Sequence, residues 1–223
     1  MSPPRFAPRA LILDMDGLMV DSEPLWFRVE RDFAAARGGA WTEELAAPCI
    51  GRGMRNTLSS MREEFVFDLD HERDAAEIID RFIVRVPELE LKRGCAALLD
   101  AARGNALLAV ASSSPARLID AVLARFGIAP RFDAVVSGEA VAHPKPAPDI
   151  FLRASAELGE APARCAVLED SLAGATAGRA AGMFVIAVPE GQWEGRGFEA
   201  VADVVATDLF EARACLSPLA RDL

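Results

Sequence analysis

The sequence predicts an α/β fold, in which a Rossmann-like parallel sheet core with helices on both faces carries an inserted helical domain. First, short apolar runs alternate with helical patterns along most of the chain, which is typical of parallel sheets. Second, residues 21–90 contain long amphipathic stretches and no clear strand. Third, polar residues directly follow several apolar runs, where ligands bind in open parallel sheets. We expect residues 1–20 and 91–223 to form the core and residues 21–90 to form the insertion.

Each strand is expected at a short apolar run, and each core helix at a segment with helical periodicity. The runs lie at residues 10–13, 106–111, 134–137, 165–168, 184–188 and 204–205. The core helices are expected at residues 95–102, 116–126, 149–158 and 173–181, and the last three are followed by the capping glycines Gly127, Gly159 and Gly182. Within the insertion, helices are expected at residues 24–37, 42–47, 55–64 and 71–86, with a helix connection at residues 65–67.

Composition and charge narrow the classes of function. The 223 residues carry a net charge of -10, and the basic residues are scattered, which argues against a nucleic-acid partner. No apolar run reaches the length of a membrane span, and residues 1–9 lack the apolar core of a secretory signal. We therefore expect a cytoplasmic monomer with neither a nucleic-acid nor a membrane partner.

The cysteines and histidines are too dispersed for the sites that need them in clusters. The four cysteines have wide and irregular spacing, whereas a zinc site needs neighbouring ligands. Buried free thiols are the better interpretation of Cys49, Cys95, Cys165 and Cys215. The two histidines lie far apart in sequence, which argues against a mechanism that depends on histidine.

Acidic and serine side chains follow the ends of the predicted strands. Asp14 and Asp16 follow the first run, a serine run begins at Ser112, and Glu169 and Asp170 follow the run at 165–168. Four carboxylates at neighbouring strand ends would repel one another strongly, and a hard cation such as Mg²⁺ relieves that repulsion. One acid can then attack a phosphorus atom while another moves protons. Helix capping is the alternative interpretation, which applies most directly to Asp170.

Four segments, in the same order, resemble the four motifs of the haloacid dehalogenase superfamily. The string D-M-D-G-L-M-V-D-S at residues 14–22 is similar to the first motif, and Ser112, at the end of an apolar run, to the second. Lys145, within H-P-K-P-A-P-D, resembles the third motif, and V-L-E-D-S at residues 167–171 the fourth. The similarity covers nearly the whole chain, and the insertion resembles the family's α-helical cap.

Within the superfamily, the chain resembles the β-phosphoglucomutase-like subgroup. Residues 16–26, which include D-S-E-P-L-W, are especially similar to phosphatases of sugar and hexitol phosphates, among them those acting on 2-deoxyglucose 6-phosphate. The resemblance implies a Mg²⁺-dependent phosphatase of a small phosphorylated metabolite. A sugar or sugar-alcohol phosphate is the preferred substrate, with phosphoglycolate and nucleotide monophosphates left open.

The resemblance also implies catalytic roles. Asp14 would attack phosphorus and form an aspartyl-phosphate, and Asp16 would protonate the leaving alcohol and then deprotonate the attacking water. Ser112 would hydrogen-bond the phosphoryl oxygens, and Lys145 would neutralise both them and Asp14. Positioned cations and donors suit this chemistry, because the transition state spreads negative charge over the phosphoryl oxygens.

Two further sets of groups are implied by the same resemblance. Mg²⁺ would be held by the carboxylates of Asp14 and Asp170 and by the main-chain carbonyl of Asp16. Glu169 would either bind the metal directly or contact a residue that does. Backbone N–H groups would help to cradle the phosphoryl group, and they belong to Met15, Asp16 and Ser113.

Other members of the superfamily define the alternatives. A dehalogenase does not need the acid at Asp16, a phosphonate hydrolase needs a cap lysine that residues 21–90 lack, and a P-type ATPase needs membrane spans. A non-catalytic relative would be expected to lose a motif acid or the motif lysine, and none is lost. A β-phosphoglucomutase-type phosphosugar mutase is the serious alternative, but such mutases carry a cap histidine where this chain has Trp26. Since an indole is neither a general acid nor a base, Trp26 favours the phosphatase, and it is expected to shape the pocket or to pack between cap helices.

The cap segment G-R-G-M-R at residues 51–55 resembles the family's substrate-specificity loop. Glycine permits close backbone approach, and Arg52 or Arg55 can bind a phosphate or a hydroxyl group. Together with Trp26, these arginines are the predicted substrate contacts of the cap. An ordinary exposed loop is the alternative interpretation.

Overall fold

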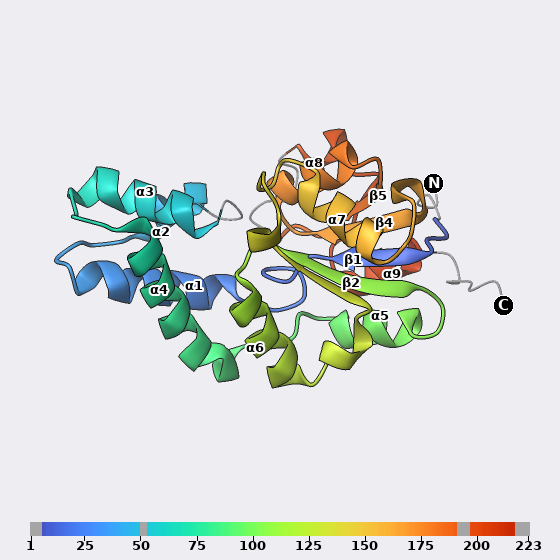
Figure 1. Ribbon diagram of the computed structural model, residues 1–223, viewed down its shortest axis with the longest axis horizontal. Helices are drawn as coiled ribbons and strands as arrows, with labels where there is room; N and C mark the ends of the chain where they lie inside the picture. The colour runs from blue at the N-terminus through green and yellow to red at the C-terminus, as the bar shows by residue number, and fades with distance from the viewer. Residues whose placement is uncertain (1–5, 50–52, 191–196, 217–223) are drawn as a thin grey trace.

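The computed structural model describes residues 6–49, 53–190 and 197–216, and a six-stranded sheet lies at its centre. The strands are β1 (Ala10–Leu13), β2 (Leu107–Ser112), β3 (Ala134–Ser137), β4 (Cys165–Glu169), β5 (Phe184–Ala187) and β6 (Val204–Val205). Neighbouring strands pair in parallel in the order β3-β2-β1-β4-β5-β6. Helices cover both faces (Figure 1), so the predicted Rossmann-like α/β fold is confirmed, and each predicted strand forms.

The side chains of β1 alternate between two apolar clusters. Leu11 and Leu13 belong to the cluster on the face covered by α5 (Cys95–Ala102), α6 (Ala116–Phe126) and α9 (Leu209–Ala214). Ala10 and Ile12 belong to the cluster on the other face, which is covered by α7 (Asp149–Glu157) and α8 (Leu172–Ala180). Because successive side chains of a strand point to opposite faces and both faces are buried here, the strand has a continuous apolar sequence.

Helix α9 is not among the predicted elements, although its start carries a sequence signal. The carboxylate of Asp208 accepts hydrogen bonds from the backbone N–H groups of Phe210 and Glu211, at 2.9 Å each. Glu211 in turn accepts one from the backbone N–H of Thr207 at 2.8 Å. The D-x-x-E spacing is typical of helix N-termini, so this helix could be found by its cap rather than by its short apolar pattern.

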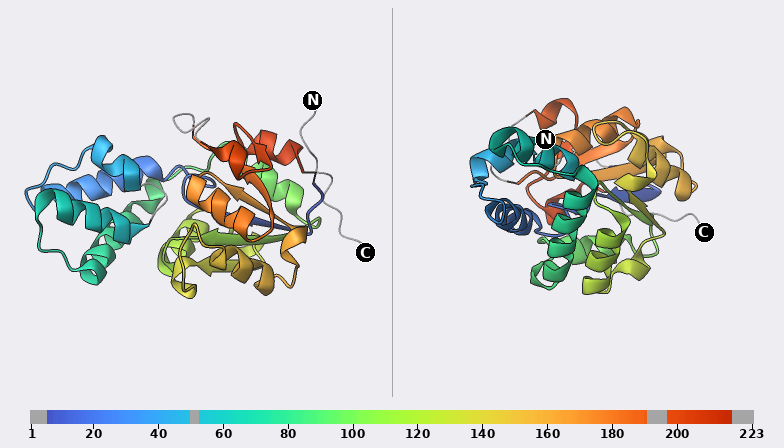
Figure 2. Two further views of the ribbon diagram at one scale, coloured as in Figure 1. Left: turned by 90° about the horizontal axis from the view of Figure 1, so that it is seen from above. Right: turned by 60° about the vertical axis from the view of Figure 1, so that its left-hand side comes forward.

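The helical insertion forms a separate body at one end of the sheet (Figures 1 and 2). It contains α1 (Glu23–Ala35), α2 (Glu43–Ala46), α3 (Met54–Phe65) and α4 (His71–Arg85), and its described residues contain no named strand. Each helix begins and ends within two residues of its predicted stretch. The segment after α3 connects it to α4, whose first turn is capped by the carboxylate of Asp70.

Two adjacent chain segments join this cap to the core. Val20 and Leu91 form an antiparallel bridge, and the N–H of Asp21 donates to the main-chain oxygen of Glu90 at 3.1 Å. The predicted domain boundaries, after residue 20 and before residue 91, fall at this bridge. The division into the two domains stays a prediction.

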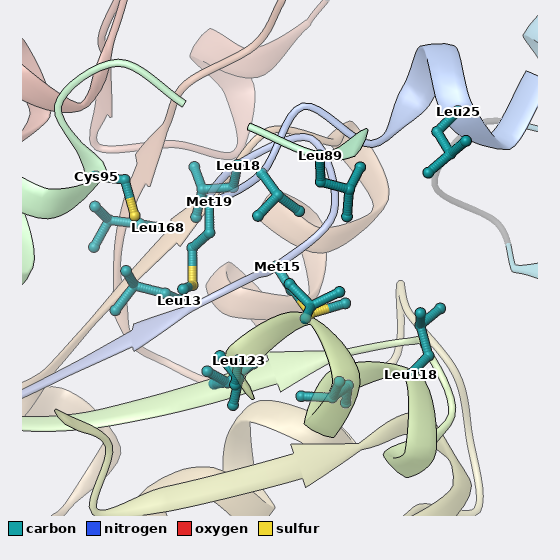
Figure 3. Packing of buried hydrophobic residues seen from close by; sticks show 14 of the residues in the cluster. Leu13, Met15, Leu18, Met19, Leu25, Leu89, Cys95, Leu118, Leu123 and Leu168 are labelled. Carbon is teal, nitrogen blue, oxygen red and sulfur yellow. The ribbon is translucent and has the colours of Figure 1, made fainter. Parts of the chain in front are cut away.

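One apolar cluster extends from the sheet into the cap. Figure 3 shows Leu13, Met15, Met19, Leu25 and Leu89, which are buried members of this cluster. Full burial of a side chain of this size contributes roughly 1.5–3 kcal/mol. The apolar side chains of Leu13 and Met19 therefore fix the chain before and after the segment that carries Asp14 and Asp16.

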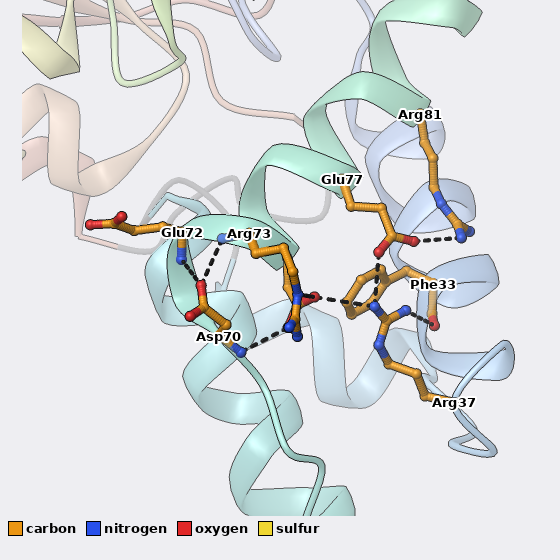
Figure 4. Close-up of polar contacts among 8 residues, drawn as sticks. Phe33, Arg37, Asp70, Glu72, Arg73, Glu77 and Arg81 are labelled. Carbon is orange, nitrogen blue, oxygen red and sulfur yellow. Dashed lines mark hydrogen bonds and ion pairs between the residues drawn. The ribbon is translucent and has the colours of Figure 1, made fainter.

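Polar contacts fix α1 against α4 within the cap (Figure 4). Arg37 donates to Asp74 at 3.2 Å and to Glu77 at 2.8 Å, and its guanidinium lies 3.6 Å from the centre of the Phe33 ring. Burial opposes the charge of Asp74, but hydrogen bonds and positive charge from Arg73 and Arg37 outweigh it and lower the pKa of Asp74. Arg37 follows the end of α1, so this end of the helix is held against α4 by a paired buried charge as well as by apolar packing.

The described residues contain no helix that is long and apolar enough to cross a membrane. Cys49, Cys95, Cys165 and Cys215 are buried free thiols, as predicted. Burial raises the pKa of Cys95 to about 12 and that of Cys165 to about 11, which disfavours the reactive thiolate. The expected cytoplasmic location and monomeric state stay predictions.

Candidate active site

The carboxyl ends of β1, β2 and β4 carry the predicted site residues. Asp14 directly follows β1, Ser112 ends β2, and Glu169 ends β4. The order of the strands reverses between β1 and β4, and ligands bind at such switch points in open parallel sheets. A cavity of about 850 Å³ lies there, and residues of both the core and the cap line it. Its volume is in the range of small-molecule sites.

Gly17 allows Asp170 to approach the loop after β1. The φ angle of Gly17 is +76°, which favours glycine, and a Cβ at this position would lie 2.2 Å from Oδ2 of Asp170. A larger residue would therefore displace the carboxylate. The glycine of the first motif thus lets Asp170 lie against the loop that carries Asp14.

Lys145 is the centre of a buried charged network. Its Nζ donates to Oδ1 of Asp14 and to Oε1 of Glu169, at 2.5 Å each, and to the main-chain oxygen of Ala111 at 3.1 Å. Glu169 also accepts hydrogen bonds from the backbone N–H of Ser171 at 3.0 Å and from its hydroxyl at 2.9 Å. The Lys145 side chain is 3% exposed and that of Glu169 is 0% exposed, so these charges depend on one another for stabilisation.

The carboxylates of this network repel one another. Burial raises the pKa of Asp14 to about 7, although the charge of Lys145 opposes the rise. Burial, followed by the charges of Glu169 and Asp14, raises the pKa of Asp170 well above its ordinary value. Burial also opposes the charge of Lys145, but the two carboxylates that it bonds raise its pKa, so it stays positive at neutral pH. The site therefore has more carboxyl groups than its one lysine can hold in the ionised form.

The donor set fits a hard divalent cation. Mg²⁺ binds proteins through one or two carboxylates, while water and substrate phosphate complete its coordination. Asp14 and Asp170 offer carboxylate oxygens to the cavity, and a cation beside them would stabilise their ionised forms, which burial and then mutual repulsion disfavour. The main-chain carbonyl of Asp16 is the predicted third donor.

The structure bears on the two predicted alternatives for Glu169, a direct metal ligand or a residue that bonds one. The described part of the chain contains no group of three or more His, Cys, Asp and Glu side chains that could hold a metal ion. The carboxylate of Glu169 is bonded to Lys145 and Ser171, and Glu169 does not line the cavity. These contacts favour the second alternative for Glu169, and the ligand roles of Asp14, Asp16 and Asp170 stay predictions.

Three donors hold the carboxylate of Asp16. The hydroxyl of Ser114 donates to Oδ2 at 2.8 Å, the hydroxyl of Ser112 lies 3.4 Å from the same oxygen, and Nε1 of Trp26 donates to Oδ1 at 3.0 Å. Ser114 is itself fixed, because its main-chain oxygen accepts a hydrogen bond from the Ser137 hydroxyl at 2.7 Å. Sequence reasoning did not single out Ser114, whose only signal was its place in the serine run. The second acid of the first motif is thus oriented by both the core and the cap.

The predicted phosphate-binding residues differ in exposure. Ser112 is buried and Ser113 is exposed, and both line the cavity. The side chain of Met15 is fully buried in the apolar cluster, so only its backbone groups are available to a ligand. The phosphate-binding roles of these residues stay predictions.

Of the two predicted cap contacts that the structure describes, Trp26 lines the cavity and Arg55 does not. Trp26 lines it and also stacks on Phe82 of α4, with ring centroids 4.0 Å apart, so it is both a cavity wall and a packing contact. Arg55 is exposed at the start of α3 and does not line the cavity, whereas its neighbour Met54 does. Consecutive residues of a helix point in different directions, so the position of Met54 does not place Arg55, whose substrate contact stays a prediction. Arg52 lies outside the described residues.

Glu30 of α1 is a cavity residue that the sequence patterns did not reveal. It is 8% exposed, its Oε2 accepts a hydrogen bond from Nε1 of Trp41 at 3.1 Å, and it also bonds the side chain of Thr57. Burial raises the pKa of Glu30 to about 7, against the effect of these two bonds. Acidic residues of amphipathic helices are mostly exposed, so sequence alone gives no reason to place this one inside.

The raised pKa of Glu30 predicts a pH-dependent stability. Because the pKa is about 7 in the folded state and ordinarily 4.5, folding favours the protonated form. The stabilising contribution is complete below pH 4.5 and is lost as the pH rises to about 7, by up to about 3 kcal/mol. Urea unfolding should therefore show that Glu30→Gln gains stability relative to wild type over this pH range. The exposed Glu63→Gln is the control, and a Glu30→Gln difference that is constant with pH would contradict the assignment.

The buried acid, the lysine bonded to it and the second acid two residues away define a hydrolase site on an α/β core. The chain belongs to the haloacid dehalogenase-like hydrolase family, whose sequence model matches residues 8–182. This range includes all the core site residues described above. The predicted membership of the superfamily is confirmed.

Relatives of known activity narrow the class to hydrolases of phosphoric monoesters. Hexitol phosphatase B of Escherichia coli (strain K12) is 34% identical over 222 residues, which cover 92% of this chain and 94% of that protein. Fructose-1-phosphate phosphatase YqaB of the same strain is 31% identical over 182 residues, which cover 80% and 95%. The crystal structure of CbbY from Rhodobacter sphaeroides in complex with phosphate has 28% identity and a TM-score of 0.83, covering 92% of this chain and 96% of that one. The chain is an enzyme of this class.

Proposed function

We propose that this enzyme hydrolyses the phosphate monoester of a small sugar or sugar alcohol, with Mg²⁺ as cofactor and an aspartyl-phosphate on Asp14 as intermediate. One observation carries the proposal: two acids line the same cavity, Asp14 bonded to Lys145 and Asp16 held by Ser114 and Trp26. The similarity to hexitol phosphatase B and to fructose-1-phosphate phosphatase supports the substrate class.

The chemistry of these groups gives the order of steps. The Asp14 oxygen that does not bond Lys145 attacks phosphorus, and the bond from phosphorus to the leaving oxygen breaks while Asp16 gives that oxygen a proton. Water then attacks the phosphorus of the aspartyl-phosphate, and Asp16 takes its proton. Asp14 and inorganic phosphate are released, and the site returns to its first protonation state.

Fixed donors stabilise the charge that develops on the phosphoryl oxygens. Lys145 is held in place by Glu169 and Ala111, so it needs little reorganisation to bond a phosphoryl group. Ser112 and the backbone N–H of Ser113 are the neutral donors of the proposal. When bound, Mg²⁺ supplies further neutralisation of the phosphoryl charge. Removal of one such preorganised donor typically costs roughly 100- to 1,000-fold in kcat.

A screen of phosphorylated metabolites tests the function. With Mg²⁺ present, we expect inorganic phosphate to be released most efficiently from hexitol and hexose monophosphates, and EDTA should abolish this release until Mg²⁺ is restored. Full activity in EDTA would overturn the cofactor. A clear preference for phosphoglycolate or nucleotides would overturn the substrate class.

The phosphosugar mutase is the alternative function. The residue at the position of the mutase histidine is Trp26, and its N–H is bonded to Asp16, which favours hydrolysis. Incubation with β-glucose 1-phosphate and a trace of glucose 1,6-bisphosphate separates the two activities. Phosphate release is expected, and isomerised sugar phosphate without phosphate release would overturn the proposed hydrolase function.

Replacement of Trp26 by phenylalanine tests the bond to Asp16. Phenylalanine keeps the packing on Phe82 but has no N–H to orient the acid. We expect kcat/KM for a sugar phosphate, whose leaving oxygen needs a proton, to fall about tenfold. For p-nitrophenyl phosphate, whose leaving group needs no proton, kcat/KM should change less than about twofold. Equal losses for both substrates would show that Trp26 shapes the cavity without orienting Asp16.

A further inference from the structure

The cavity continues along α1 beyond the end that holds the reacting groups. Trp26, which bonds Asp16, and Glu30 lie one helical turn apart, and both line the cavity. Four residues of an α-helix rise about 6 Å, so Glu30 lies about that far beyond Trp26 along the helix axis. An extended six-carbon chain is about as long. A six-carbon substrate that lies along α1 with its leaving oxygen near Asp16 therefore extends toward Glu30.

Glu30 is held in a defined position. Its partners Trp41 and Thr57 are themselves buried, at 2% and 4% exposure. A carboxylate has about four acceptor sites, and these two partners leave acceptor sites for a ligand. The cap side of the cavity also carries apolar side chains, among them Met54 and Ile79. Because Glu30 is only 8% exposed, a ligand group beside it that lacked a hydrogen bond would be unfavourable.

The charge of the cap side of the cavity does not suit a second phosphate. Among the described cap residues that line it, the only cation is Arg28, which is paired with Glu88 at 3.0 Å. Arg117 of the core also lines the cavity and lies against α4, where it is bonded to Asp80 and to the main-chain oxygen of Ala76. The acids of the cap wall outnumber these two paired cations, and they are Glu23, Glu30, Glu43 and Glu72. A phosphate group at this end would meet like charge, which is unfavourable. A neutral end that carries hydroxyl groups fits better.

We propose that Glu30 is a specificity-determining residue that accepts a hydrogen bond from a distal hydroxyl group of the substrate. It selects hydroxylated monophosphates over alkyl phosphates of the same length and over bisphosphates. The proposal rests on the proposed function, because it takes the phosphate end of the substrate to lie at Asp14. A site built to bond a substrate hydroxyl rejects the analogue that lacks it, since a buried polar group is then left unpaired.

The test compares glucitol 6-phosphate with n-hexyl phosphate. The two probes have the same carbon chain and a primary leaving oxygen, but only the first carries hydroxyl groups. Wild type should have the higher kcat/KM for glucitol 6-phosphate. Glu30→Leu should lower this preference about 10- to 100-fold, through glucitol 6-phosphate alone. Glu63→Leu, which removes an exposed glutamate of α3 that does not line the cavity, is the matched control and should leave the preference unchanged.

The outcomes separate this proposal from the proposed function. If wild type hydrolyses neither probe nor p-nitrophenyl phosphate, both the proposed function and the role of Glu30 are overturned. If p-nitrophenyl phosphate is hydrolysed but wild type shows no preference for glucitol 6-phosphate, the function stands and the role of Glu30 is overturned. A loss that is equal for all three substrates would make Glu30 purely structural and would also overturn the proposal.

Two further measurements complete the test. If circular dichroism shows that Glu30→Leu does not fold, Glu30→Gln decides, because its amide oxygen can still accept from Trp41. It should reduce the preference at least about threefold, and an unchanged preference would overturn the proposal. Fructose 1,6-bisphosphate should be a poorer substrate than fructose 1-phosphate, and the reverse order would overturn the discrimination against a second phosphate.

Discussion

Replacement of Asp14 by asparagine is expected to lower kcat by more than about 10,000-fold. An amide oxygen is a far weaker nucleophile than a carboxylate, so the aspartyl-phosphate does not form. The fold should persist, because asparagine keeps the shape of the side chain and can still accept a hydrogen bond from Lys145. Phosphate release from a saturating sugar phosphate with Mg²⁺ measures the loss, and circular dichroism checks the fold.

Asp120→Asn is the matched control for this change. Asp120 is exposed on α6, away from the cavity, and its replacement makes the same chemical change. Its kcat should stay within about twofold of wild type. Phosphate release at the same rate by wild type and Asp14→Asn would remove Asp14 from the role of nucleophile.

Replacement of Lys145 by methionine should have the second-largest effect, on both stability and activity. Methionine keeps the length of the side chain but leaves Asp14 and Glu169 as buried carboxylates without the cation between them. Breaking a buried charge pair in this way costs about 3–5 kcal/mol in the free energy of unfolding. The loss of a cation that stabilises the phosphoryl group should lower kcat/KM roughly 100- to 1,000-fold.

The second lysine of the chain provides the control for Lys145. Lys92 is 27% exposed and pairs with Glu190 and Asp21, so Lys92→Met should cost less than about 1 kcal/mol and change kcat/KM little. Urea unfolding in EDTA measures the free energy of unfolding of both variants. Adding Glu169→Gln to Lys145→Met should restore part of the stability but none of the activity. A Lys145→Met variant as stable as wild type would refute the buried network.

The sheet and its acidic edge could be predicted because their signals are local. A strand buried on both faces has a continuous apolar sequence, and the residue that follows it is placed at the ligand-binding edge by the parallel arrangement alone. Asp14, Ser112 and Asp170 are found in this way, one strand end at a time. Their order along the chain then made the resemblance to a known family specific.

Whether Glu169 faces the cavity or bonds Lys145 could not be decided from the sequence. Adjacent residues at a strand end point in different directions, so one acid bonds Lys145 while the other lies against Gly17. The sequence shows two acids side by side but not which of them faces the cavity. That choice depends on where the lysine, 24 residues earlier, is placed by the fold.

The contacts of the cap were even less accessible to sequence reasoning. Trp26 was expected to shape the cavity or to pack between helices, and it does both, but its bond to Asp16 depends on how the cap sits on the core. Glu30 is buried because Trp41, eleven residues away on another segment, donates to it. Arg55 lies in a segment that resembles a substrate-specificity loop, but its exposed position leaves its substrate contact a prediction. Such contacts are set by the packing of helices and not by any local pattern.

Trapping the phosphorylated enzyme tests the proposed chemistry most directly. Asp16→Ala should still be phosphorylated by p-nitrophenyl phosphate, because that leaving group needs no proton, but it should lose the phosphoryl group slowly because no base activates water. After an acid quench, borohydride reduces an acyl phosphate to the alcohol, and mass spectrometry then locates the modified residue. The expected result is homoserine at position 14, absent from the Asp14→Asn/Asp16→Ala double variant. Release of p-nitrophenol in a burst with residue 14 unmodified, or with the reduced residue elsewhere, would contradict the role of Asp14 as the nucleophile.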